Sequence, residues 1–208
     1  MEFASEMVVK ASLYGLIIEE TPTTLKPDGR SRPPHLKTWR DGWRHLRFLL
    51  LHSPRWLFIY PGAALIILGL LGSFSLALGE VALTPHISLN VHSLVVSCFA
   101  ILIGVQLMVF GALARRYHTL EGVLPPAARF QKFLMGMNLE SILQVALVIF
   151  AAGAAGIAWS VASWAGSGFG PIHYDSLMRV LVMSLTGVAV AIQLAAAGFL
   201  ASVFALRR

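Results

Sequence analysis

Four long apolar segments constrain the fold of this 208-residue chain more than any other feature. They run approximately over Trp56–Leu78, Ser93–Ala114, Ser141–Trp164 and Val180–Leu206, and their central stretches contain no Lys, Arg, Asp or Glu. A helix of roughly 20 apolar residues crosses about 30 Å of hydrocarbon. Since 57% of the residues are hydrophobic and only 12% are charged, we expect a membrane protein with four spans rather than a water-soluble domain.

The connections between these segments alternate in charge. Nine of the sixteen Lys and Arg residues precede residue 56. Others stand in the middle loop and at the chain end: Arg115, Arg116, Arg129, Lys132, Arg207 and Arg208. The two remaining loops, Gly79–Val91 and Ala165–Arg179, contain a single basic residue between them, Arg179. Because cytoplasmic loops carry an excess of Lys and Arg, we expect both termini in the cytoplasm.

The first residues predict a small α/β unit. In "EFASEMVVKASLYG" the apolar side chains follow helical spacing, and Gly15 is a C-terminal stop. These side chains are Phe3, Met7, Val8 and Leu13. The stretch "LIIEETPTTL" predicts a strand interrupted by Pro22. One helix and one strand cannot bury a core, so we interpret residues 1–37 as the remnant of a cytoplasmic domain, either truncated at Met1 or completed by a separate subunit. A surface-lying or disordered tail is the alternative.

From Thr38 to His52 the sequence predicts an amphipathic helix with Thr38 as its N-cap. One face carries Trp39, Trp43, Leu46 and Leu50, and another carries Arg40, Arg44 and Arg47. Such a helix can lie in the membrane interface, with tryptophans at headgroup depth and arginines toward phosphates. Pro54 ends it. We therefore assign residues 38–53 to a juxtamembrane helix and residues 54–208 to a four-helix transmembrane domain.

The loop before this helix combines a turn signal with two guanidinium groups and a hydroxyl. In "PDGRSRPP" a Pro-Asp-Gly turn is followed by Arg30, Ser31 and Arg32. Arginine binds phosphate oxygens through paired, charge-assisted hydrogen bonds, which makes these residues candidate phosphate ligands. Juxtamembrane basic clusters also act as topology determinants or as general contacts for anionic lipids, and the pattern alone leaves these alternatives open.

Three motifs in residues 1 to about 60 give a resemblance to a known family. They are Glu20-Thr21-Pro22 at the strand end, Gly29-Arg30-Ser31-Arg32 in the loop, and the helix Trp39–Leu51. The segment resembles the end of the catalytic domain and the membrane entry of bacterial family 2 glycosyltransferases, above all dolichyl- or polyprenyl-phosphate mannosyl- and glucosyltransferases. The four spans are similar to that family's longer members in number and orientation only.

This resemblance implies a reaction and a site. Members of the family transfer a sugar from a nucleotide-sugar to the phosphate of a polyprenyl lipid at the cytoplasmic face. Carried over to this chain, Arg30, Ser31 and Arg32 would bind the lipid phosphate. Further candidates are Arg40, Arg44 and Arg47.

The chain departs from the family at the donor site. Members hold Mg²⁺ or Mn²⁺ through an Asp-x-Asp motif, whereas Asp28, Asp41 and Asp175 stand apart and no glycine-rich loop replaces the motif. The seven histidines are spread over different loops and predict no metal site. We therefore expect no catalytic residue and no metal ligand here, and a missing catalytic domain or a separate catalytic subunit as the partner.

The spans themselves predict helix packing rather than an ion pathway. Small residues recur every fourth position, as Ala152, Gly156 and Ser160 and as Gly187, Ala191 and Ala195, which favours close approach of helices in lipid. The glutamines Gln106, Gln144 and Gln193 predict interhelical hydrogen bonds, and Cys98 predicts packing. No span has the buried ionisable pair expected of a pump or coupled transporter.

The expected protein is thus mainly α, with a short α/β remnant, an amphipathic interfacial helix and four transmembrane helices. We expect it to be the lipid-acceptor-binding portion of a polyprenyl-phosphate glycosyltransferase in the bacterial inner membrane, inactive alone and without a nucleic-acid partner. The alternative is a non-enzymatic four-span protein, flippase-like or a scaffold, in lipid-linked sugar assembly. In-frame DNA upstream of Met1 that encodes a nucleotide-binding domain would exclude the alternative.

Overall fold

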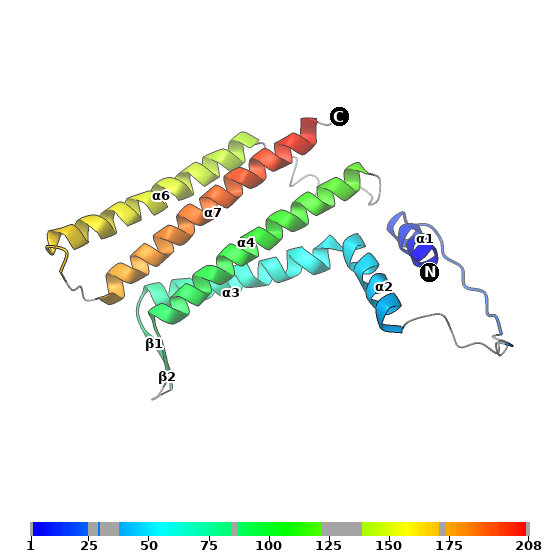
Figure 1. Cartoon of the computed structure of the whole chain (residues 1–208), viewed down its shortest axis with the longest axis horizontal. Coiled ribbons are helices and arrows are strands. Elements are labelled where there is room, and N and C mark those ends of the chain that lie inside the picture. Colours follow the sequence, from blue (N-terminus) through cyan, green and yellow to red (C-terminus); the bar gives the residue numbers. More distant parts are fainter. Residues whose placement is uncertain are drawn as a thin grey trace.

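The computed structural model describes residues 2–24, 29, 38–84, 87–121, 139–170 and 174–206. Its helices are α1 (Glu2–Leu13), α2 (Thr38–His52), the π-helix η1 (Arg55–Ile59), α3 (Tyr60–Ala77), α4 (Val91–Leu120), α6 (Leu139–Gly166) and α7 (Tyr174–Leu206). Two antiparallel strands, β1 (Val81–Thr84) and β2 (Ile87–Leu89), join α3 to α4. Figure 1 shows the four long helices side by side in the order α3, α4, α7, α6.

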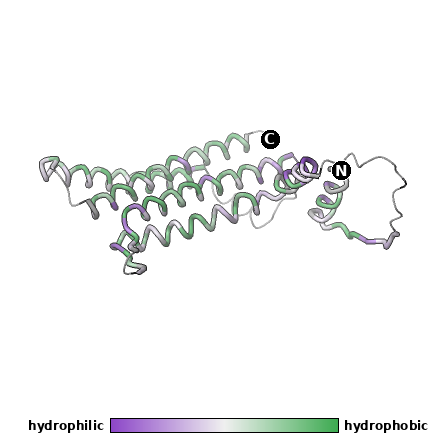
Figure 2. The backbone as a smooth tube through the Cα atoms, turned by 60° about the horizontal axis from the view of Figure 1, so that its bottom comes forward, coloured by the Kyte–Doolittle hydropathy of each residue, from purple (hydrophilic) through white to green (hydrophobic). Residues whose placement is uncertain are grey.

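Four helical segments are long and apolar enough to cross a membrane, which confirms the expected fold class. They are Arg55–Ala77, Val91–Leu120, Leu139–Gly166 and Ser176–Phe204. Figure 2 shows hydrophobic residues along all four, with hydrophilic residues concentrated toward the ends. Most of their large apolar side chains face outward, as Leu71, Phe74, Val148 and Phe199 do. Such a surface is stable against lipid tails but not against water.

The helices have two distinct ends. At the hairpin end lie β1–β2, the start of α4 and the start of α7; at the basic end lie η1, the end of α4, the start of α6 and the end of α7 (Figure 1). Helix α4 is antiparallel to α3, since Gly62 meets Gly104 while the later Gly69 meets the earlier Ser97. Helix α4 is parallel to α7, since contacts join Asn90 to Arg179 and Tyr117 to Phe204. With four long helices in the chain, η1 and the end of α7 both lie at the basic end.

Glycines let α3 and α4 approach closely. A Cβ atom at Gly104 would lie 2.7 Å from the carbonyl oxygen of Gly62, and one at Gly69 would lie 2.7 Å from that of Ser97. Because real Cβ atoms do not come so close to a neighbouring backbone, any larger residue would force these helices apart. In lipid, where the hydrophobic effect is absent between helices, such close packing is a main source of association.

The predicted small-residue ridges pack α6 against α7, with one position corrected. A Cβ atom at Gly153 would lie 2.8 Å from the carbonyl oxygen of Ser184, and Ser160 and Ala191 are buried. The predicted ridge residue Ala152 is exposed. Gly153 takes its place at the contact, because only one of two adjacent positions can face the partner helix.

One predicted interhelical hydrogen bond is missing. The Oε1 atom of Gln193 is buried and has no hydrogen-bond partner among the described residues. Burial of Cys98, in contrast, is confirmed: it packs with Leu76 and Leu94 at the hairpin end, and its Sγ lies 3.6 Å from Ser73 Oγ.

Helix α1 ends as the sequence predicts, but the predicted strand after it does not form. Gly15 has φ +67°, its N–H donates to Ser12 O, and the Leu16 N–H donates to Ala11 O. These two bonds define a Schellman cap. Residues 16–24 have no regular secondary structure, and Ile17 is 98% exposed. A strand needs a neighbour to pair its backbone, and within the described residues the segment has none.

Candidate lipid-phosphate site at the basic end

The sequence-predicted ligands fall into two groups. Arg30, Ser31 and Arg32 lie outside the described residues, so their assignment stays a prediction. Arg40, Arg44 and Arg47 lie on α2 and are exposed. Arg40 Nε is 3.9 Å from Asp41 Oδ1, a separation at which a solvent-exposed pair contributes little. These three guanidinium groups are therefore accessible on the surface of α2.

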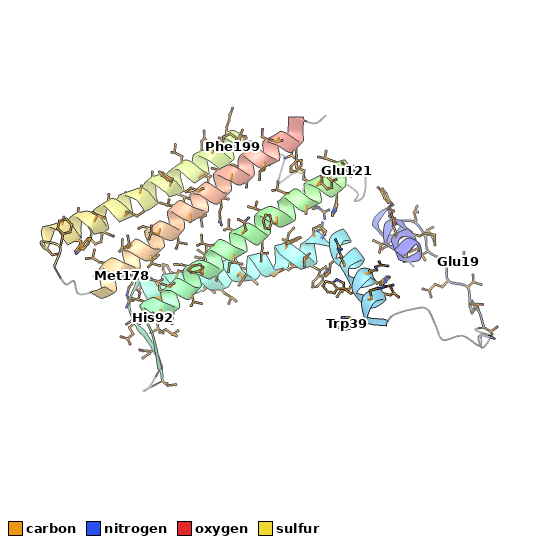
Figure 3. The ribbon with its side chains drawn as sticks, in the orientation of Figure 1. Glu19, Trp39, His92, Glu121, Met178 and Phe199 are labelled. Carbon is orange, nitrogen blue, oxygen red and sulfur yellow. The ribbon has the colours of Figure 1, made fainter. Side chains whose placement is uncertain are left out.

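Both the apolar face and the basic face of α2 are exposed. Trp39 is 89% exposed, and Trp43 and Leu46 are also exposed. Figure 3 places Trp39 at the start of α2, away from the four long helices. An exposed apolar face beside exposed arginines is typical of a helix lying at the membrane interface. The helix ends at His52, before Pro54, as predicted.

A π-helical turn leads from α2 into the first span. The Tyr60 N–H donates to Arg55 O, which is a five-residue rather than a four-residue step. The next residue, Pro61, has no N–H to donate, so the regular helical pattern cannot run unbroken through this turn. Single π turns of this kind are frequent at functional sites.

The π turn packs directly on α4. A Cβ atom at Gly111 would lie 2.9 Å from Ile59 Cγ1 and 3.0 Å from Phe58 Cβ. Arg115 follows Gly111 by one turn, and Arg55 precedes Ile59 by about one turn. Because the two elements are antiparallel, both steps lead toward the basic end and bring Arg55 and Arg115 to the same level. The positive charge of Arg55 acts electrostatically on Arg115, which is only 9% exposed.

Several aromatic rings lie near the level of Arg55 and Arg115. Trp56 and Tyr60 contact each other edge to face, with centroids 4.9 Å apart, and both are exposed. Tyr117 lies 6.0 Å from the ring of His118 and 6.5 Å from that of Phe204 on α7. Aromatic residues of this kind mark the membrane–water boundary. The basic end therefore combines interfacial aromatics with closely placed guanidinium groups.

Carboxylates and histidines do not gather into a metal site. Among the described residues, no group of three or more His, Cys, Asp or Glu side chains is placed to hold an ion. Glu6 on α1 forms an exposed ion pair with Lys10 at 2.7 Å. This bond raises the pKa of Lys10 and marks a solvated helix face. The described residues therefore do not fit a donor site with Mg²⁺ or Mn²⁺.

A second buried arginine lies at the hairpin end and has a structural role. Arg179 is 7% exposed; it donates to Leu76 O at 2.5 Å and to Asn90 Oδ1 at 2.7 Å. Asn90 Oδ1 also accepts from Val91 N at 2.8 Å and so caps α4. One side chain thereby connects the end of α3, the start of α4 and the start of α7.

Sequence reasoning missed the pairing of Arg55 with Arg115. Both were counted as charges that set topology. A sharper signal was present, since Arg55 directly precedes the first apolar run and Arg115 directly follows the second. Two spans joined by a short loop are antiparallel neighbours, so residues at those two boundaries meet at one end.

The comparisons with known proteins agree with this architecture. Residues 112–205 match the family model of the glycosyltransferase family 2 C-terminal transmembrane region. The chain is 33% identical over 170 residues to the low-salt glycan biosynthesis hexosyltransferase Agl6 of Haloferax volcanii; this alignment covers 81% of the chain but 40% of that relative. No solved structure matches the chain. The chain is therefore related to the C-terminal part of family 2 glycosyltransferases, and residues 112–205 are similar to that family's transmembrane region.

Proposed function

We propose that this chain is the membrane and acceptor-binding portion of a glycosyltransferase that moves a sugar from a nucleotide-sugar to a polyprenyl phosphate. The observation that carries the proposal is the match of residues 112–205 to the family 2 transmembrane region. Similarity to a hexosyltransferase supports a hexose as the transferred sugar. The concentration of arginine at one end of four apolar helices supports a lipid acceptor with an anionic head.

The physical task of such a portion is to present a lipid phosphate to a soluble donor. A polyprenyl tail is held in the hydrocarbon by its own apolarity, while cations at the interface attract and orient the phosphate. The lipid phosphate is the nucleophile. Holding it at the membrane surface replaces a random encounter between a membrane lipid and a soluble donor with a reaction between groups already in position. We assign Arg30, Ser31 and Arg32 to the phosphate, with Arg40, Arg44 and Arg47 on α2 as its further contacts.

The donor and its metal belong elsewhere in this proposal. In the proposal, a nucleotide-binding domain or subunit outside the described residues supplies the donor site, and Mg²⁺ or Mn²⁺ binds there. The chain alone binds the acceptor and has no transferase activity. Its basic end faces the cytoplasm, where nucleotide-sugars are found, and the membrane is the plasma membrane.

A binding experiment on the chain itself tests this proposal. The chain is reconstituted in nanodiscs of phosphatidylcholine and exposed to a photoreactive polyprenyl phosphate or to the matching polyprenol. We expect crosslinking to the phosphate and little to the alcohol, because the tails are identical and only the head differs in charge. Equal crosslinking of both lipids contradicts acceptor binding.

A pair of variants localises the binding. Arg30→Ala with Arg32→Ala is expected to lower crosslinking of the phosphate while membrane insertion is unchanged, because hydropathy alone drives insertion. The control variant is Lys26→Ala, which removes a nearby cation outside the assigned set. A double variant that crosslinks as well as the control contradicts the assignment of this loop.

A further inference from the structure

The end of α6 is closed by a cap that carries two aromatic rings, and it lies at the hairpin end (Figure 1). The Phe169 N–H donates to Trp164 O at 3.2 Å, and the Gly168 N–H donates to Ala165 O at 3.0 Å. These two bonds define a Schellman cap, in which the outermost pair of side chains is often in contact. Here the Trp164 and Phe169 rings meet edge to face, with centroids 5.0 Å apart. The cap therefore holds the two rings as one group.

Phe169 has an unusual backbone conformation for a large residue. Its φ is +58°, after a φ of +70° at Gly168. Glycine adopts this left-handed region without cost, whereas a residue with a Cβ atom is crowded against its own backbone there. Such a conformation persists only where other interactions of the residue compensate it. A glycine at position 169 would donate the same backbone hydrogen bond, so the compensation has to come from the Phe169 ring.

The contact with Trp164 uses only part of that ring. Phe169 is 61% exposed, and Trp164 is 41% exposed. Residues 161–170 contain no Lys, Arg, Asp or Glu. Val161, one turn before Trp164, is also exposed, on a helix that is long and apolar enough to cross a membrane. Because an apolar ring is stabilised by leaving water, the aromatic pair extends the lipid-facing surface of α6 to the end of the helix.

The Trp164 indole is oriented as tryptophans are at a membrane boundary. Its Nε1 donates to Gly170 O at 3.4 Å, so the polar edge of the ring faces the loop beyond the helix. The Trp164 carbonyl accepts from Ser167 Oγ at 2.8 Å, which fixes the same turn. Tryptophan is enriched at the membrane–water boundary because one end of its ring is apolar and the other donates a hydrogen bond. The geometry at the end of α6 matches that environment.

We propose that Trp164 and Phe169 form an aromatic anchor that inserts between the headgroups and the acyl chains of the leaflet at the hairpin end. Lipid covers the exposed parts of both rings, and their transfer out of water compensates the strained backbone of Phe169. The anchor sets the depth at which α6 ends. Trp56 and Tyr60 are exposed at the basic end, so aromatic pairs mark both boundaries of the four-helix region. This inference concerns the position of the spans in the bilayer and is independent of the acceptor.

The depth of the α6 end in a bilayer tests the anchor. The full chain carries Cys98→Ala and Ala165→Cys, so that a single spin label reports from the exposed position 165, and it is reconstituted in phosphatidylcholine nanodiscs. Electron paramagnetic resonance measures the accessibility of the label to oxygen, which concentrates in lipid, and to a nickel chelate, which stays in water. This starting form is compared with Phe169→Asn, Phe169→Gly and Phe169→Leu, and with Ser176→Asn as the control at an exposed position of α7. Circular dichroism checks that each variant keeps its helices.

Asparagine and glycine both accept the left-handed backbone, so these two variants keep the cap and lose only the ring. We expect each to shift the label toward water by about 1.5–3 Å, the rise of one or two helical residues. Phe169→Leu should stay close to the starting depth, and Ser176→Asn should not shift the label.

An unchanged depth in both Phe169→Asn and Phe169→Gly overturns the inference. A shift in Phe169→Leu as large as that in Phe169→Asn overturns the role of apolar immersion. A label that is shielded from both reagents in the starting form shows that protein rather than lipid covers the rings, and it overturns the assignment to lipid.

Discussion

The two ends of the four-helix region each bury an arginine, and they surround it differently. At the hairpin end, Arg179 donates to Leu76 O and Asn90 Oδ1, two neutral acceptors supplied by neighbouring helix ends. At the basic end, the contact of Phe58 and Ile59 with Gly111 brings Arg55 on η1 to the same level as the buried Arg115 on α4. The first arrangement uses a buried charge to join helices, whereas the second concentrates charge of one sign.

This difference separates structure from binding. The Leu76 carbonyl lies in the last turn of α3, and the C-terminal end of a helix carries partial negative charge. The second acceptor, Asn90 Oδ1, is a neutral side-chain carbonyl at the N-terminus of α4. The hairpin end is also where Leu76, Leu94 and Cys98 form the buried apolar cluster, closed by Val81 and Leu89 of the two strands. The hairpin end is thus joined by its own hydrogen bonds and apolar contacts, while the basic end places Arg55 and Arg115 beside interfacial aromatic rings.

The largest expected effect is loss of the hairpin-end junction. Arg179→Met removes two hydrogen bonds from a charged donor, one to Leu76 O and one to Asn90 Oδ1, each worth about 1.5–3 kcal/mol, so we expect a loss of about 3 kcal/mol in unfolding free energy. Denaturant titration in mixed micelles measures it. Arg116→Met makes the same chemical change at a partly exposed position and should have a small effect. Equal stability of Arg179→Met and wild type would show that the two hydrogen bonds of Arg179 do not contribute to the unfolding free energy.

The close contact between α3 and α4, which we call the α3–α4 seam, should give the next largest effect on stability. Gly104→Ala puts a methyl group against the backbone of α3, and overpacking of this kind costs about 1–3 kcal/mol. The matched control is Gly187→Ala on α7, where the nearest atom to a new Cβ would be 3.9 Å away. Equal stability of the two variants contradicts the close approach of α3 and α4.

A smaller effect is expected at Asn90, which serves two bonds at the hairpin end. Asn90→Ala removes the cap of α4 and one acceptor of Arg179, and loss of such a cap costs about 1 kcal/mol. Asn90→Asp keeps both acceptor roles and adds a negative charge at a helix N-terminus and beside Arg179, so it should be at least as stable as wild type. The same titration compares them. An Asp variant less stable than the Ala variant would contradict the geometry of this junction.

The elements that sequence could predict are those that depend on local composition. The four spans follow from hydropathy, since length and apolarity are enough to require a helix in lipid. The end of α1 at Gly15 and the end of α2 before Pro54 follow from the backbone chemistry of single residues. The predicted strand after α1 failed because a strand depends on a pairing partner, and local propensity cannot supply one.

The contacts that sequence could not predict join distant residues. Arg179 and Leu76 are 103 positions apart, and no local pattern relates them. The glycines of the α3–α4 seam recur seven residues apart, from 62 to 69 and from 104 to 111. A pattern of small residues at every fourth position therefore does not include them. Of the candidate site, the sequence identified the exposed arginines of α2, but it treated Arg55 and Arg115 as separate topology charges.

The smallest expected effect on stability has the opposite sign and most directly tests the contrast between the ends. Arg55→Gln removes a like charge from beside Arg115, so unfolding free energy measured without an anionic lipid should rise slightly, by less than about 1 kcal/mol because Arg55 is exposed. If Arg55→Gln instead destabilises the chain as Arg179→Met does, the basic end is a structural junction too, and the distinction between the two buried arginines is wrong.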